Sequence, residues 1–89
     1  MDVSLVIPAY NESKIVLDTI RTVSARLAEL KVEYEVLIVD DGSTDGMGQL
    51  VRDCGDPHVR LEGYAPNCGK GRAVRTGMLA ARGDLILCT

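Results

Sequence analysis

The feature that most restricts how this chain can fold is an alternation of two hydrophobic periods. Four short apolar runs, rich in β-branched residues, alternate with three stretches in which apolar residues recur every three or four positions. Such runs are typical of buried strands, and such stretches are typical of amphipathic helices. The expected strands are residues 3–7, 34–39, 58–61 and 85–88, and the expected helices are residues 13–30, 47–54 and 71–81. This order predicts an α/β fold with a parallel sheet and right-handed crossovers, with the fourth strand beside the first.

Polar and small residues near the helix ends give more local expectations. Residues 11–13 (Asn-Glu-Ser) carry side chains that commonly cap a helix N-terminus, so we expect them to begin the first helix. Gly83 follows the third expected helix, where a glycine often ends a helix. Ala73, Gly77 and Ala80 are small enough to let that helix pack close to the sheet.

Composition limits the class of protein. The chain has 89 residues, 46% hydrophobic and 26% charged, as in a small folded domain and unlike a disordered or fibrous segment. No apolar run approaches the ~20 residues that cross a bilayer, and the net charge of −3 argues against a general nucleic-acid binder. Cys54, Cys68 and Cys88 are odd in number and widely spaced, which favours a reducing compartment over a disulfide framework.

Ligands of open parallel sheets bind beyond the carboxyl ends of the strands. The polar segments that fall there are residues 8–12, residues 40–43 and the loop before the third helix. Asp40 and Asp41 offer carboxylates that suit a base N–H or a ribose diol, Tyr10 can stack on a base, and Glu12 can accept from a ribose hydroxyl. Structural alternatives stay open. Either aspartate can cap the next helix, Tyr10 can be a packed loop residue, and Glu12 can stabilise a helix N-terminus.

The segment 67–72 (Asn-Cys-Gly-Lys-Gly-Arg) opens the third expected helix and suits an anion. Backbone N–H groups at a helix N-terminus and the ammonium group of Lys70 together favour a phosphate. Basic residues gather around this segment, namely Arg60, Lys70, Arg72, Arg75 and Arg82. For Arg75 and Arg82, a solvated helix face is an equally good interpretation.

The sequence does not match several other well-known binding and catalytic motifs. A P-loop requires Ser or Thr after its Gly-Lys pair, whereas Gly71 follows Lys70 here. The first turn lacks the glycines of a dinucleotide-binding fingerprint. Cys54 and His58 have no second ligand pair for zinc. His58 is the only histidine, and a strand-start residue explains it better than a catalytic base.

Three ordered motifs carry a resemblance to a known family. Residues 3–12 (VSLVIPAYNE), 39–45 (VDDGSTD) and 67–77 (NCGKGRAVRTG) resemble the opening motifs of family 2 inverting glycosyltransferases. The third motif continues as MLAARGDLIL. It most resembles the enzymes that transfer a sugar to dolichyl or polyprenyl phosphate, such as dolichyl-phosphate glucosyltransferases. The resemblance covers nearly the whole chain.

The resemblance implies the N-terminal portion of a GT-A, Rossmann-like fold that binds a nucleotide-diphosphate sugar. About four strands and three helices of that fold are expected here. By motif, the resemblance assigns Pro8, Ala9 and Tyr10 to the base pocket, Glu12 to the ribose, Asp41 to the base with Asp40 beside it, and Lys70 to the diphosphate.

The resemblance also implies parts of the enzyme beyond Thr89. In the family, a strand like the last one leads into an Asp-x-Asp motif that holds Mg²⁺ or Mn²⁺, and the catalytic base and acceptor site lie further on. Residues 1–89 are therefore expected to be the donor-binding part of a longer enzyme, inactive alone, with no catalytic or metal-binding residue of its own. The whole enzyme is expected to act at the cytoplasmic face of a membrane. It would transfer a sugar from a UDP-glucose or GDP-mannose type donor to polyprenyl or dolichyl phosphate.

Two alternative functions stay open. The chain can instead belong to a family 2 enzyme with a different acceptor, or it can be a non-catalytic nucleotide-binding module.

Residues 85–88 have no polar alternation, so we expect a strand buried on both faces. Left at the edge of a sheet, such a strand favours self-association of the isolated chain.

Overall fold

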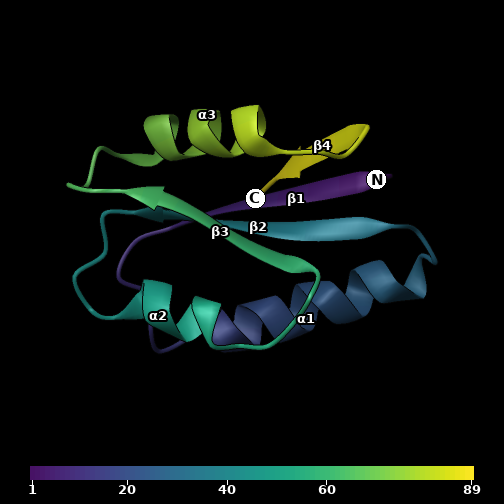
Figure 1. The fold of residues 1–89 in the computed structure, drawn as a ribbon, viewed down its shortest axis with the longest axis horizontal. Helices are drawn as coiled ribbons and strands as arrows, with labels where there is room; N and C mark the ends of the chain where they lie inside the picture. Colours follow the sequence, from purple (N-terminus) through teal and green to yellow (C-terminus); the bar gives the residue numbers. More distant parts are fainter.

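A computed structural model describes all of residues 1–89 and has the predicted architecture (Figure 1). Four parallel strands form one sheet in the order β3-β2-β1-β4, which confirms the α/β fold and the place of the fourth strand beside the first. The strands are β1 (Val3–Ala9), β2 (Tyr34–Asp41), β3 (Val59–Tyr64) and β4 (Leu85–Cys88), and the helices are α1 (Val16–Glu29), α2 (Met47–Arg52) and α3 (Lys70–Ala80).

The helices cover both faces of the sheet. Helix α3 lies alone on one face, and α1 and α2 lie on the other (Figure 1). Successive side chains of a strand point to opposite faces. Strand β2 therefore sends Val36 and Ile38 into the core beneath α1 and α2, and Leu37 and Val39 into the core beneath α3. All four are fully buried, which explains the uninterrupted apolar run in the sequence.

Small residues let α3 approach the sheet closely, as predicted. Ala73 and Gly77 are buried, and a Cβ atom at Gly77 would overlap the side chain of Val6 in β1. Ala80 packs against the edge of the same core. A larger side chain at position 77 would push α3 away from β1 and β2.

The expected role of Gly83 at the end of α3 is wrong. Ala81 ends the helix in an extended conformation, and Gly83 does not have the positive φ angle of a helix-ending glycine. A Cβ atom at Gly83 would overlap the backbone of Ser4, and the Gly83 N–H donates to Ser4 Oγ at 2.7 Å. Glycine is needed there because the turn before β4 passes close to β1.

Strand β4 is less buried than its composition predicts. Leu85 and Leu87 are 54% and 43% exposed, so the expectation of burial on both faces is wrong for residues 1–89. These leucines stand beside Val3 and Leu5 of β1, on the sheet face that α1 covers elsewhere. They remain exposed because β4 lies at the edge of the sheet, outside the core that α1 and α2 form on this face.

Candidate functional site

The loops that follow β1, β2 and β3 lie at one end of the sheet, because the strands all run in the same direction (Figure 1). The first two loops are bonded to each other. Asn11 Oδ1 accepts from the Thr44 N–H at 2.8 Å, and the Ser13 N–H donates to Asp45 Oδ2 at 3.0 Å. The predicted capping role of this segment is therefore wrong. Helix α1 begins after Ile15 without a side-chain cap, and the polar groups join two loops instead.

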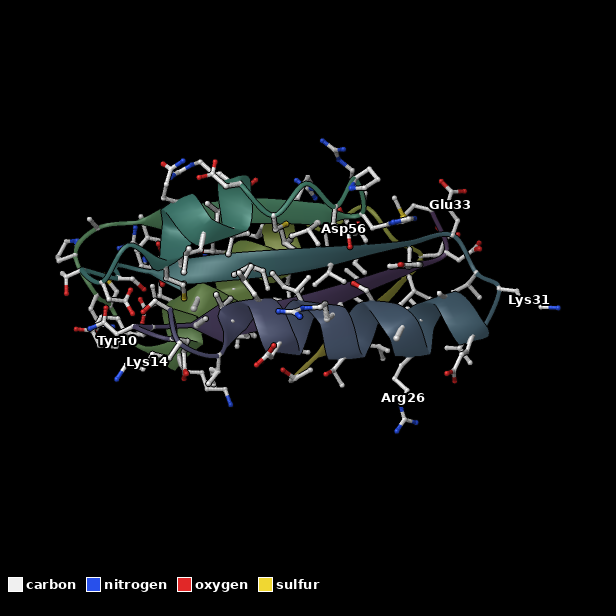
Figure 2. All side chains as sticks on the ribbon, turned by 90° about the horizontal axis from the view of Figure 1, so that it is seen from below. Tyr10, Lys14, Arg26, Lys31, Glu33 and Asp56 are labelled. Atoms are coloured by element: carbon white, nitrogen blue, oxygen red, sulfur yellow. The ribbon has the colours of Figure 1, made fainter.

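A cleft of about 350 Å³ opens at this end of the sheet. Figure 2 shows Tyr10 at this end of the molecule, and Lys31 and Glu33 at the opposite end. The cleft brings together five of the seven site residues predicted from the sequence, namely Pro8, Ala9, Tyr10, Asp41 and Lys70. The cleft is lined by Pro8, Ala9, Tyr10, Asp41, Asn67, Gly69, Lys70, Ala73 and Thr89.

Asp41 is buried at the floor of this cleft, and its carboxylate accepts four hydrogen bonds. Oδ1 accepts from Tyr64 OH at 2.6 Å and from the Cys68 N–H at 2.9 Å. Oδ2 accepts from Asn67 Nδ2 at 2.9 Å and from the Gly69 N–H at 3.0 Å. Burial alone would raise the pKa of Asp41, but these hydrogen bonds and the positive charge of Arg72 hold it below its usual range.

Glycine at position 42 allows the loop before α3 to reach Asp41. Gly42 has a φ angle of +73°, and a Cβ atom there would overlap the backbone of Asn67. The loops after β2 and β3 thus touch through their main chains, which only glycine permits. This contact holds the amide groups of Cys68 and Gly69 against Asp41.

Lys70 lines the cleft as the first residue of α3. Its side chain is exposed, and the glycine before it has a φ angle of 92°, so the chain turns sharply into the helix at this point. The positive end of the helix dipole and the ammonium group share one side of the cleft. The arrangement suits a phosphate group, as the sequence predicts.

Asp40 and Glu12 do not line this cleft. Asp40 follows the strand alternation to the opposite face, where it borders a separate concavity of about 900 Å³ between α2 and β3. Its Oδ1 accepts from the Ser43 N–H at 2.8 Å, which supports the structural alternative of a turn-stabilising aspartate. Glu12 is exposed, and its carbonyl oxygen accepts from the N–H groups of Ile15 and Val16 at the start of α1.

Two of the five basic residues near α3, Arg60 and Arg72, have specific side-chain partners. Arg60 pairs with Glu35 and Glu62 and also donates from Nη2 to the carbonyl oxygen of Ala80 at 2.7 Å. The Arg72 guanidinium lies over the ring of Tyr64, 4.4 Å from its centroid. Arg75 is exposed, consistent with a solvated helix face. His58 stacks on Tyr34 at the start of β3, where a strand-start residue was predicted.

The sequence pattern gave no role to two residues that the structure makes important. Tyr64 and Glu35 both lie on the α3 face of the sheet, and each is hydrogen-bonded to a group far away in the sequence. A signal existed for Glu35, because a charged residue inside an apolar strand is buried only when it is paired. No such signal existed for Tyr64.

The chain contains no group of three or more His, Cys, Asp or Glu residues placed to hold a metal ion. None of the helices is long and apolar enough to cross a membrane.

Solved structures of glycosyltransferases share this fold. A mannosyltransferase of Pyrobaculum calidifontis, solved with GDP-Man and Mn²⁺, superimposes with a TM-score of 0.78 at 26% identity, over 94% of this chain and 25% of that one. TarS of S. aureus with UDP-GlcNAc superimposes with a TM-score of 0.83 at 26% identity, over 100% of this chain and 26% of that one.

Curated relatives also carry the names of sugar transferases. The chain is 37% identical over 91 residues to a dolichyl-phosphate beta-glucosyltransferase of Trichomonas vaginalis, covering 94% of this chain and 27% of the relative. It is 38% identical over 88 residues to an undecaprenyl-phosphate 4-deoxy-4-formamido-L-arabinose transferase of Aeromonas hydrophila, covering 96% and 27%. The chain thus spans about a quarter of the length of these relatives.

The family model of glycosyl transferase family 2 matches residues 4–89, which include all nine residues that line the cleft. The fold is that of the N-terminal part of a GT-A glycosyltransferase. The chain therefore belongs to glycosyl transferase family 2.

Proposed function

We propose that residues 1–89 are the donor-binding part of an inverting glycosyltransferase. The enzyme would transfer a sugar from a UDP-glucose or GDP-mannose type donor to dolichyl or polyprenyl phosphate. The observation that carries this proposal is the cleft itself. It places a buried carboxylate, an exposed tyrosine and a lysine at a helix N-terminus around one space at the carboxyl ends of the strands.

Each lining residue has chemistry that suits part of a nucleoside diphosphate. Pro8, Ala9 and Tyr10 offer an apolar and aromatic wall for the base. Asp41 offers a carboxylate for a base N–H, and Lys70 offers a cation for the diphosphate.

Glu12 and Asp40 lie outside the lining of the cleft. Glu12 is exposed on the loop after β1, so we keep it as a ribose contact that forms when a donor binds. Asp40 lies on the far face of β2, so we propose that it acts only by shaping the loop that follows.

The expected reaction displaces a nucleoside diphosphate from the anomeric carbon of the sugar. A phosphate oxygen of the acceptor attacks that carbon from the opposite face, so its configuration inverts. The bond to the leaving phosphate oxygen breaks, and the electron pair stays on that oxygen. Lys70 lines the cleft at the N-terminus of α3, and we propose that both stabilise this growing negative charge.

We propose that the whole enzyme uses a divalent cation. The printed description of the Pyrobaculum structure names Mn²⁺ together with GDP-Man. We propose Mg²⁺ or Mn²⁺ for this enzyme as well, held by an Asp-x-Asp segment after β4. Bound there, the cation would neutralise charge on the diphosphate.

The acceptor assignment rests on the relatives whose names include a dolichyl or undecaprenyl phosphate. Such an acceptor places the reaction at a membrane surface, and we propose the cytoplasmic face. A family 2 enzyme with another acceptor remains the second candidate. A succinoglycan biosynthesis protein of Rhizobium meliloti, 43% identical over 86 residues, favours it.

Calorimetry with UDP-glucose and GDP-mannose, on the protein at its natural length, tests the donor-binding proposal. Asp41→Asn should weaken binding of the preferred donor by about 1.5–3 kcal/mol, the usual range for a hydrogen bond to a charged group. Asp18→Asn is the matched control, because Asp18 is exposed on α1 and lies outside the cleft. Equal affinity of wild type and Asp41→Asn for both donors would refute the assignment of Asp41 to the base.

A further inference from the structure

Tyr64 lies directly behind the carboxylate of the donor cleft. It is the last residue of β3 and stands opposite Asp41 in the register of the parallel pair. Its hydroxyl donates to Asp41 Oδ1 at 2.6 Å, the shortest of the four hydrogen bonds that this carboxylate accepts. Tyr64 is half-buried and does not line the cleft, so a ligand in the cleft would leave this contact in place.

The Asp41 carboxylate has no spare acceptor position in this structure. Its two oxygens offer about four lone-pair sites, and all are taken by Tyr64, Asn67 and the two loop amides. A ligand N–H can bind Asp41 only if one of these donors moves. The Asn67 side chain is exposed and lines the cleft, whereas the Tyr64 hydroxyl approaches from behind.

The ring of Tyr64 makes a second connection, to the helix that carries Lys70. The Arg72 guanidinium lies 4.4 Å from the ring centroid, a cation–π distance. Arg72 Nη1 also donates to Cys68 Sγ at 3.3 Å. One side chain of β3 therefore contacts both the carboxylate and the first turn of α3, which together form two walls of the cleft.

We propose that Tyr64 is a positioning residue of the donor site. Its hydroxyl fixes the orientation of the Asp41 carboxylate toward the base, and its ring fixes the first turn of α3 so that Lys70 faces the diphosphate. The inference rests on the proposed function, because it assumes that a nucleoside diphosphate occupies this cleft. Tyr64 itself does not touch the nucleotide. A Tyr64 variant should therefore bind more weakly because Asp41 and Lys70 shift away from the nucleotide.

Tyr64→Phe in the natural-length protein tests the inference, with UDP and GDP as probes. The variant keeps the ring and its contact with Arg72 but removes the hydroxyl. We expect about tenfold weaker binding of the preferred nucleotide, since a hydrogen bond to a charged group is lost behind the site. Tyr34→Phe is the matched control. Tyr34 is buried at the other end of β2 and stacks on His58, away from the cleft.

The pH profile of binding separates positioning from general stability. The groups that face Asp41 are Tyr64 of β3, Cys68 of the loop and Arg72 of α3, and the cleft adds Tyr10 and Lys70. Without the hydroxyl, the pKa of Asp41 should rise, so the loss of binding on acidification should begin at a higher pH in Tyr64→Phe. Tyr34→Phe should keep the wild-type profile.

A double-mutant cycle with Asp41→Asn completes the test. If Tyr64 acts through Asp41, Tyr64→Phe should lose less than about threefold in the Asp41→Asn background, because neutral hydrogen bonds are weaker. Equal losses in both backgrounds, an unshifted acid limb, or binding within twofold of wild type would overturn the inference. A Tyr64→Phe protein without a cooperative melt would also overturn it, because the hydroxyl would then serve the whole fold. Wild type that binds neither UDP nor GDP would instead refute the proposed function.

Discussion

The guanidinium of Arg60 and the carboxylate of Glu35 form an ion pair on the α3 face of the sheet, with Nε and Oε1 2.9 Å apart. The other carboxylate oxygen accepts from Ser4 Oγ and from the Arg82 N–H, at 2.5 and 2.8 Å. Glu35 thus joins β1, β2, β3 and the turn before β4. This carboxylate and that of Asp41 lie six residues apart on one face of β2. They bind the segments just after and just before α3 and hold both ends of the helix.

Removal of the Glu35 charge should destabilise the fold strongly. In Glu35→Gln, the partly buried Arg60 loses its main partner, and the free energy of unfolding should fall by about 3 kcal/mol. Urea unfolding followed by circular dichroism measures the change. Glu33→Gln is the control, because Glu33 is exposed and its substitution should change stability by less than ~0.5 kcal/mol. Equal midpoints for the two variants would contradict a structural role for Glu35.

Glu35 should also set part of the acid sensitivity of the protein. Burial alone would raise the Glu35 pKa, but hydrogen bonds from Arg60, Ser4 and Arg82 lower it from 4.5 to about 2. A lowered pKa stabilises the fold above the unfolded value and loses that effect as pH falls through the folded value. About 3 kcal/mol of stability should therefore be lost between about pH 5 and pH 2.

A comparison of thermal melts in this pH range isolates the Glu35 contribution. Glu35→Gln should show a shallower loss of stability on acidification than wild type, because it has no carboxylate to protonate at this position. Asp41 and Asp45 also have lowered pKa values and remain in both proteins. Parallel curves for the two proteins would show that Glu35 does not contribute.

Lys70 should contribute to phosphate binding rather than to base binding. Lys70→Ala should weaken UDP or GDP binding by about tenfold, while the affinity for uridine or guanosine should stay nearly unchanged, because the lost partner is a diphosphate. Lys14→Ala is the control, since Lys14 is exposed at the same end of the molecule but outside the cleft (Figure 2). Calorimetry with nucleoside and nucleoside diphosphate measures both affinities. Equal losses of affinity for the nucleoside and the nucleoside diphosphate would show that Lys70 is an ordinary solvated surface residue.

Two glycines of α3 should respond in opposite ways to the same substitution. Gly77→Ala places a methyl group against Val6 and Val39, and it should destabilise the protein by about 1–3 kcal/mol through overpacking. Gly71→Ala adds a methyl group in open space, and it should stabilise the helix by up to ~1 kcal/mol. Thermal melts of both variants compare the effects. Similar melting temperatures would contradict the close approach of α3 to the sheet.

The exposed edge of β4 should make the 89-residue chain self-associate. Leu85 and Leu87 are partly exposed on an edge strand, and such edges pair with other chains. Leu87→Lys should reduce the oligomer fraction in light scattering, because a charge blocks pairing at an edge. Leu30→Lys is the control, since Leu30 is 65% exposed at the end of α1. A strictly monomeric wild-type chain would contradict this expectation.

The sequence alone determined the strand and helix order, the place of the fourth strand, and the segments that form the cleft. These features follow from local periods and from the geometry of parallel sheets, in which loops after successive strands meet at one edge. The segments that contain Tyr10, Asp41 and Lys70 could therefore be placed at one end of the sheet from the sequence, and the family resemblance added Pro8 and Ala9.

Only the tertiary structure decided how the polar residues are used. Asp40 and Asp41 are adjacent in the sequence, yet the strand alternation sends them to opposite faces, and only Asp41 reaches the cleft. Asn11 and Ser13 bind a loop about thirty residues away instead of capping their own helix. Gly83 serves a close approach to β1 rather than a helix end. The roles of Asn11, Ser13 and Gly83 depend on partners that are distant in the sequence, so no local pattern contains them.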